Sequence, residues 1–311
     1  MNFTQSLTLF LKRKILIISC IGLVLIILLI NLTFLLSSKD NIVIGHDDPK
    51  LSSSLQPADS NLSKGVNLVE GNTPSVNTLQ KEILANPVYL DKKDIKEFKI
   101  PIYFYHYIRD VPHDNSLTDR LSVSAETFEK QLVQVKKLGY TSITFTDLIN
   151  YIYKGIQLPS KPIILSFDDG YDNHYTQAYP LLTKYNLKGN FAIITGNVGK
   201  MGYMTWDQVK ILKAAGFEID SHSVTHPNLS LASLQRLIYE LSESKKVLDS
   251  LLHQNTQVLV YPSGKFNAEV EKAAKDQGYL LARSTLYSLN FDLHLPYEVP
   301  GLEIMTGFKV I

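Results

Sequence analysis

Two adjacent carboxylates, Asp168 and Asp169, directly follow an apolar run that is typical of a buried strand. Successive side chains of a strand point to opposite faces, so two neighbours at its end cannot share one orientation. We therefore expect different tasks for them, one holding a metal ion and the other handling a proton. The competing interpretation is a strand-to-helix turn in which an aspartate only caps backbone N–H groups.

A second polar cluster, at residues 220–226, contains His222 and His226. Two histidines four positions apart face the same way on a single helical turn. With an aspartate from a neighbouring strand end, they would form a set of two histidines and one carboxylate that leaves metal positions open for water and substrate. The two clusters together therefore predict a metal site.

The composition excludes some partners and some kinds of site. The chain has 311 residues, 45% of them hydrophobic, which is enough for one sizeable domain with appendages. The chain has a formal net charge of only +1 and no long basic run interleaved with aromatics. It therefore lacks the usual signature of a protein that binds nucleic acid. The single cysteine, Cys20, allows neither a disulfide within the chain nor a cysteine zinc site.

An apolar segment at residues 15–37 has the length of a helix that crosses a bilayer once. Lys12-Arg13-Lys14 precedes it, and the positive-inside bias then predicts that residues 1–14 are cytoplasmic and that the remainder lies outside the cytoplasmic membrane. A cleaved signal peptide is the alternative, but its apolar core should be shorter and end in small residues. We therefore predict an uncleaved single-pass anchor, whose partner is the lipid bilayer.

Residues 38–97 are rich in Ser, Asn, Asp, Lys and Pro, which predicts a flexible stalk. From residue 98 to 311, strand-like and helix-like segments alternate, which predicts a parallel α/β barrel or open sheet with functional residues at the carboxyl ends of its strands. The expected strands are 100–107, 140–145, 162–167, 190–195, 217–221, 257–261, 279–284 and 298–304. The expected helices are 124–138, 146–153, 174–185, 205–215, 230–252 and 267–277.

The stretch SFDDG at residues 166–170 resembles the first motif of the polysaccharide deacetylases, the NodB-homology domain of carbohydrate esterase family four. The stretch HSVTH at residues 222–226 resembles their second, metal-binding motif. Flanking residues, such as YHY at 105–107 and MTW at 204–206, resemble the branch that de-N-acetylates poly-N-acetylglucosamine in biofilm exopolysaccharides. The resemblance covers roughly residues 98–311 and implies a distorted (β/α)7 barrel.

The resemblance also implies an activity, the metal-dependent release of acetate from the N-acetyl groups of an extracellular N-acetylglucosamine-containing polysaccharide. Carried over by residue, it makes Asp168 the catalytic base and makes Asp169, His222 and His226 the ligands of one divalent metal ion. Zinc suits these ligands best, and cobalt or nickel would also be accepted. Peptidoglycan or a chitin-like chain is the alternative substrate.

The later motifs of the family match less well. The third motif aligns with residues 260–264, where the backbone N–H of Ser263 would be the oxyanion donor, but its arginine is absent and Arg283 is a possible replacement. His294 approximates the fifth motif and is the candidate general acid. These departures leave a catalytically inactive carbohydrate-binding relative as the competing interpretation. We expect His174 to be solvated, and we expect four residues to bind substrate: Tyr171, Trp206, Tyr261 and His106.

Overall fold

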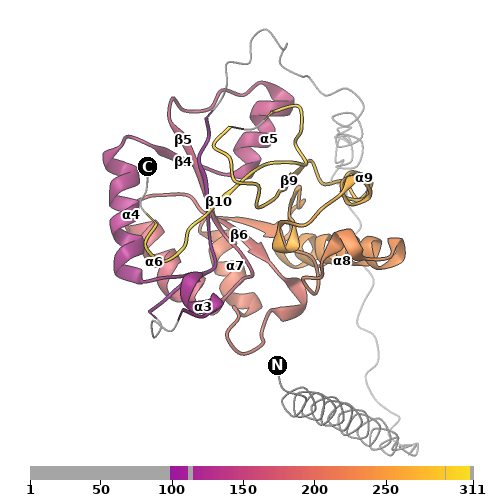
Figure 1. Cartoon of the computed structure of the whole chain (residues 1–311), viewed down its shortest axis with the longest axis horizontal. Coiled ribbons are helices and arrows are strands. Elements are labelled where there is room, and N and C mark those ends of the chain that lie inside the picture. Colours follow the sequence, from indigo (N-terminus) through magenta and orange to yellow (C-terminus); the bar gives the residue numbers. More distant parts are fainter. Residues whose placement is uncertain (1–98, 111–114, 291, 309–311) are drawn as a thin grey trace, which may run out of the picture. The chain divides into compact units, whose positions relative to one another are not determined.

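The computed structural model describes residues 99–110, 115–290 and 292–308, which Figure 1 shows in colour. The predicted cytoplasmic segment, anchor and stalk, residues 1–97, lie outside this part of the chain. Among the described residues, no helix is long and apolar enough to cross a bilayer.

An eight-stranded parallel sheet lies at the centre of the domain (Figure 1). Seven strands follow the order β10-β1-β5-β6-β7-β8-β9, and β4 pairs with the first half of β5. The strands are β1 (Ile102–Tyr105), β4 (Thr141–Ile143), β5 (Pro162–Phe167), β6 (Asn190–Ile193), β7 (Glu218–Ser221), β8 (Val258–Val260), β9 (Leu281–Arg283) and β10 (Leu302–Glu303). The predicted α/β class with parallel strands is therefore confirmed.

The segment that carries β10 contacts both edges of this sheet. Val299 forms a parallel bridge with Arg283 of β9. A few residues later, Leu302 pairs in parallel with Tyr103 of β1. The strands therefore form an α/β half-barrel, which is consistent with the barrel type that the resemblance implies.

Helices connect most of the strands. They are α3 (Leu117–Arg120), α4 (Ala125–Lys137), α5 (Phe145–Lys154), α6 (Tyr179–Lys184), α7 (Trp206–Ala214), α8 (Leu234–Leu252) and α9 (Ala268–Asp276), with a π-helix (His174–Ala178) before α6. The side chains of Ser124, Thr144 and Thr205 each accept a hydrogen bond from the third helical N–H, which fixes where α4, α5 and α7 begin. Gly155 ends α5 in the left-handed conformation.

Some local predictions were wrong. The helix expected from residue 230 begins at Leu234, because Ser233 caps it and residues 229–231 form a 3-10 turn. The short parallel pair β2 (Tyr107–Ile108) and β3 (Ser122–Val123) was not predicted, because two-residue strands are too short to show a periodic pattern.

The two faces of β5 meet different surroundings. Leu165 and Phe167 join a buried apolar cluster that also contains Phe128 of α4. The alternate residues Ser166 and Asp168 point to the other face of the strand. The Ser166 hydroxyl donates a hydrogen bond to Oδ1 of Asp168 at 3.4 Å. The alternation of the strand therefore turns Asp168 toward the interior of the half-barrel.

Candidate functional site

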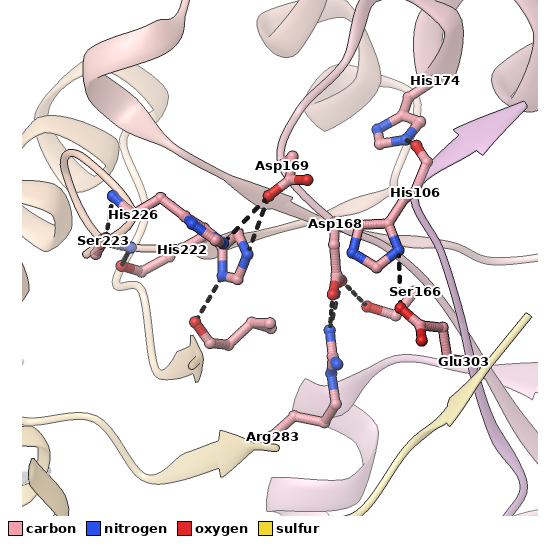
Figure 2. Close-up of polar contacts among 12 residues, drawn as sticks. His106, Ser166, Asp168, Asp169, His174, His222, Ser223, His226, Arg283 and Glu303 are labelled. Atoms are coloured by element: carbon pink, nitrogen blue, oxygen red, sulfur yellow. Dashed lines mark hydrogen bonds and ion pairs between the residues drawn. The ribbon is translucent and has the colours of Figure 1, made fainter. Parts of the chain in front are cut away.

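Asp169, His222 and His226 converge just beyond the carboxyl ends of β5 and β7 (Figure 2). Nε2 of His222 lies 3.3 Å and Nε2 of His226 lies 3.5 Å from Oδ1 of Asp169. One potential ligand atom from each of the three residues lies within 4.8 Å of the others. The structure thus brings together the three side chains that were predicted to hold a metal ion.

The second histidine is placed by a loop rather than by a helical turn, so the local prediction was wrong. Residues 222–226 adopt neither helix nor strand, and Ser223 and His226 have left-handed φ angles of 63° and 58°. Asp169 is also left-handed, with a φ of 77°. Non-glycine residues rarely adopt this conformation, and such residues gather at functional sites.

The protonation states in this cluster suit metal binding. Nδ1 of His222 lies 2.7 Å from the carbonyl oxygen of Val260, so its N–H donates there and Nε2, which faces Asp169, is the ring atom available to a metal ion. Burial, followed by the neighbouring charge of His222, lowers the pKa of His226 and favours its neutral form. Burial raises the pKa of Asp169, but the hydrogen bond and charge of His222 outweigh it and keep a carboxylate. Two imidazoles and a carboxylate fit zinc, cobalt or nickel.

Asp168 forms a buried ion pair with Arg283, the last residue of β9 (Figure 2). Both carboxylate oxygens contact Nη2 of the guanidinium, which is fully buried and lies over the ring of Phe104 at 4.3 Å. Burial alone would raise the pKa of Asp168, but the charges of Arg283 and of two nearby histidines hold it below its ordinary value. Arg283 therefore supplies the guanidinium that is absent from the third motif.

His106 lies beside Asp168 at the carboxyl end of β1 (Figure 2). Its Nδ1 is 3.4 Å from Oε1 of Glu303, and its side chain is 18% exposed, so a ligand can reach it. Its charge contributes to the lowered pKa values of both Asp168 and Asp169. The sequence predicted that His106 binds substrate. Its position beside Asp168 also suits the transfer of a proton.

The structure does not bring His294 to this cluster. Its Nδ1 pairs with Oδ1 of Asp292 at 2.7 Å, and the adjacent Leu293 belongs to the same buried cluster as Ile100, which precedes β1. Asn290 in the same loop bridges to Lys99, also before β1. The metal-binding residues lie at the opposite, carboxyl ends of the strands, so the predicted role of His294 as general acid does not fit its position.

The other residues predicted to contact substrate differ in their placement. The ring of Tyr171 stacks on that of Tyr107 with centroids 4.1 Å apart, which covers one of its faces. Trp206 is the first residue of α7, and it packs against the buried apolar cluster that contains Phe128 and Phe167. Tyr261 is only 1% exposed and stacks on Phe266, so the prediction that it binds substrate was wrong.

Ser263 lies in a tight turn after β8 with a φ of 53°. The N–H groups of Gly264 and Lys265 donate to carbonyls within the turn, at 2.8 and 3.1 Å. Ser263 itself is exposed. The turn packs closely on the next strand end, because a Cβ atom at Gly264 would lie 2.1 Å from Oγ1 of Thr285.

Substitution Gly264→Ala is therefore expected to displace this turn and to lower activity together with stability. Gly139→Ala is the matched control, since Gly139 is also left-handed but a Cβ atom there would meet nothing within 4 Å. The control should be destabilised only by the cost of placing alanine in the left-handed conformation, about 1–2 kcal/mol, and it should keep its activity. Denaturant unfolding measures the loss of stability, and acetate release, the activity that the resemblance implies, measures the loss of activity. Equal losses in the two variants would show that the contact with Thr285 is unimportant.

His174 was expected to be solvated, but it is fully buried and supports the segment that carries His106. Its Nε2 lies 2.6 Å from the carbonyl oxygen of His106 and donates to it (Figure 2). The side chain of the adjacent Asn173 accepts a hydrogen bond from the N–H of Ile108 at 2.8 Å. Both residues lie at the start of the π-helix, an element that often marks functional sites.

Burial lowers the pKa of His174 from 6.5 to about 4, so the domain should lose stability as the pH falls between these values. The unfolded chain binds a proton there that the folded chain does not, so the contribution of His174 is complete above pH 6.5 and is lost toward pH 4. The shift corresponds to roughly 3 kcal/mol. Urea unfolding with chelator present should show that His174→Gln depends less on pH than the wild type. Identical pH profiles would contradict the burial of a neutral imidazole.

Comparison with known proteins agrees with this geometry. The family model described as "Polysaccharide deacetylase" matches residues 155–282, a range that contains both polar clusters. "Putative polysaccharide deacetylase YxkH" of Bacillus subtilis is 32% identical over 193 residues, which cover 62% of this chain and 67% of the relative. "Poly-beta-1,6-N-acetyl-D-glucosamine N-deacetylase" of Staphylococcus aureus is 26% identical over 213 residues, 63% of this chain and 71% of the relative.

Among solved structures, the Streptococcus pyogenes deacetylase PplD in complex with acetate is similar to this chain. The TM-score is 0.64 and the sequence identity 29%, and the match covers 68% of this chain and 95% of the other.

Proposed function

This chain is a member of the polysaccharide deacetylase family of hydrolases, and on that premise we propose that it uses one divalent metal ion to remove N-acetyl groups from an extracellular polysaccharide that contains N-acetylglucosamine. The observation that carries the proposal is the convergence of Asp169, His222 and His226 next to Asp168, a buried carboxylate held by Arg283. Zinc is the proposed ion.

A divalent ion held by the three ligands would act as a Lewis acid for the attacking water and for the acetyl carbonyl. Asp168 is placed to accept a proton from that water as its oxygen attacks the carbonyl carbon. Arg283 keeps Asp168 ionised and fixes its orientation. The backbone N–H of Ser263 would stabilise the negative charge on the acetyl oxygen.

Breaking the C–N bond then requires a proton for the departing amine. We assign this proton to His106, because it lies beside Asp168 and is partly exposed. The products are acetate and a free amino group on the polymer.

A poly-N-acetylglucosamine type of substrate is supported by the S. aureus relatives, whose names state that activity. Peptidoglycan and chitin-like chains use the same chemistry and are the alternatives. The location outside the cytoplasmic membrane is supported by the apolar segment 15–37 and by the basic residues Lys12-Arg13-Lys14 before it.

Acetate release from β-1,6-linked N-acetylglucosamine oligomers by the full-length protein tests the proposal. Release should stop with a chelator and return when zinc is added. Chitin oligomers and peptidoglycan, assayed in parallel, decide between the substrates. A protein that binds these glycans but releases acetate from none of them would be a carbohydrate-binding relative without activity. The presence of all four residues of the two main motifs, Asp168, Asp169, His222 and His226, argues against that outcome.

A further inference from the structure

A fully buried carboxylate, Glu240 of α8, lies against the loop that carries the two histidines. Its Oε2 accepts hydrogen bonds from the consecutive backbone N–H groups of Val224 and Thr225, both at 2.8 Å. Its Oε1 accepts from the Thr225 hydroxyl at 2.6 Å and pairs with Nη2 of Arg236 at 2.6 Å. A buried carboxylate is costly unless it is paired and hydrogen-bonded, and these four contacts meet that condition.

The opposite side of the same loop is held by backbone groups that follow β6. The N–H of Thr195 donates to the carbonyl of Ser223 at 3.2 Å, and the N–H of Gly196 donates to the carbonyl of Val224 at 2.9 Å. A Cβ atom at Gly196 would lie 2.6 Å from that carbonyl oxygen. The loop is thus fixed through its carbonyls on one side and through its N–H groups by Glu240 on the other.

The two histidines differ in how they are positioned. His222 is buried and its ring is fixed by the carbonyl of Val260. His226 is 30% exposed. Both it and Ser223, in the same loop, have a left-handed backbone conformation, which is intrinsically unfavourable for residues other than glycine. The contacts of Glu240 fall on Val224 and Thr225, directly before His226. They therefore act on the histidine that has the weaker support.

We propose that Glu240 is a positioning residue that holds residues 223–226 in their metal-binding conformation before the ion arrives. This inference rests on the proposed metal site. Without Glu240 the loop would relax, and part of the binding free energy of the ion would be spent on ordering it again. Loss of residues that orient metal ligands typically weakens metal binding by about 10–100-fold.

Cobalt titration of the metal-free full-length protein tests this role, because the absorption of bound Co²⁺ reports both affinity and ligand geometry. Glu240→Ala is expected to weaken cobalt binding by about 10–100-fold and to alter the spectrum. Glu240→Gln keeps an amide oxygen for the N–H groups of Val224 and Thr225 but loses the charge, so its affinity should lie between those of Glu240→Ala and the wild type. A purely structural residue would not produce this order in metal affinity.

Asp249→Asn is the matched control on the same helix. Asp249 accepts from the N–H of Thr256 at 2.6 Å and from Lys245 at 2.9 Å, next to the start of β8 and away from the loop. This variant should lose stability without losing cobalt affinity. If Glu240→Ala does not fold, Thr225→Val, which removes the hydroxyl contact to Oε1, should still weaken cobalt binding.

Wild-type affinity and spectrum in Glu240→Gln together with Thr225→Val, or in a folded Glu240→Ala, would overturn the role of Glu240 and leave the metal site intact. A wild-type protein that binds no cobalt would instead contradict the metal site itself. The two failures are therefore distinguishable.

Discussion

The Asp168→Asn variant is expected to lose about 10²–10⁴ in deacetylation rate while it keeps its metal ion. Asparagine has nearly the shape of aspartate but cannot accept the proton of the attacking water. Asp168 itself contacts Arg283, whereas its neighbour Asp169 faces the two histidines. Acetate release and metal analysis of the purified full-length variant measure the two properties separately.

Asp169→Asn is the matched variant, and it should lose the metal first and the activity as a consequence. If Asp168→Asn loses the metal and Asp169→Asn retains it, the two roles must be exchanged. If both variants keep metal and activity, the site lies elsewhere. Thermal unfolding belongs to the same experiment, because Asp168→Asn leaves a buried guanidinium without its counter-charge.

Arg283→Met is expected to lower the free energy of unfolding by about 3–5 kcal/mol and to abolish most of the activity. The substitution leaves Asp168 buried without its cation, and burial then raises the pKa of Asp168 and favours the neutral acid, which cannot act as a base. Lys188→Met is the control, since Lys188 pairs with Asp147 at the surface and should contribute less than about 1 kcal/mol.

The double variant Asp168→Asn/Arg283→Met separates the ion pair from other effects of each residue. Removing both charges should cost less than the sum of the two single substitutions, because neither partner is left alone in the interior. Additive losses would show that Arg283 supports the fold independently of Asp168.

The strands and helices that the sequence predicted well carry strong local signals. The bounds of β5 agree with the expected run at residues 162–167, because a continuous apolar strand ends there in two carboxylates. The start of α4 follows from Ser124, whose side chain caps it, whereas α5 begins at Phe145, one residue before the expected start, because Thr144 caps it. The π-helix and the irregular 222–226 loop depend on contacts with distant segments, so local spacing did not reveal them.

The same distinction applies to the site. Asp168 and Asp169 are adjacent, and His222 and His226 are four positions apart, so short motifs were sufficient to identify them. Arg283 was named as a replacement for the missing arginine, but it lies 115 positions from Asp168 in the sequence, and its contact with Asp168 depends on the position of β9 beside β8. His294 and Tyr261 matched motif positions, but His294 lies in the loop after β9, next to the buried Leu293, and Tyr261 is packed in the core with residues of α8 and α9.

Metal analysis of the wild type and of His222→Ala is the most direct test of the proposed site. His222 is the better choice of the two histidines because its ring is buried and already oriented toward Asp169 by Val260. We expect one divalent ion per chain in the wild type and almost none in His222→Ala. Full occupancy in a folded His222→Ala variant would contradict the ligand set of Asp169, His222 and His226.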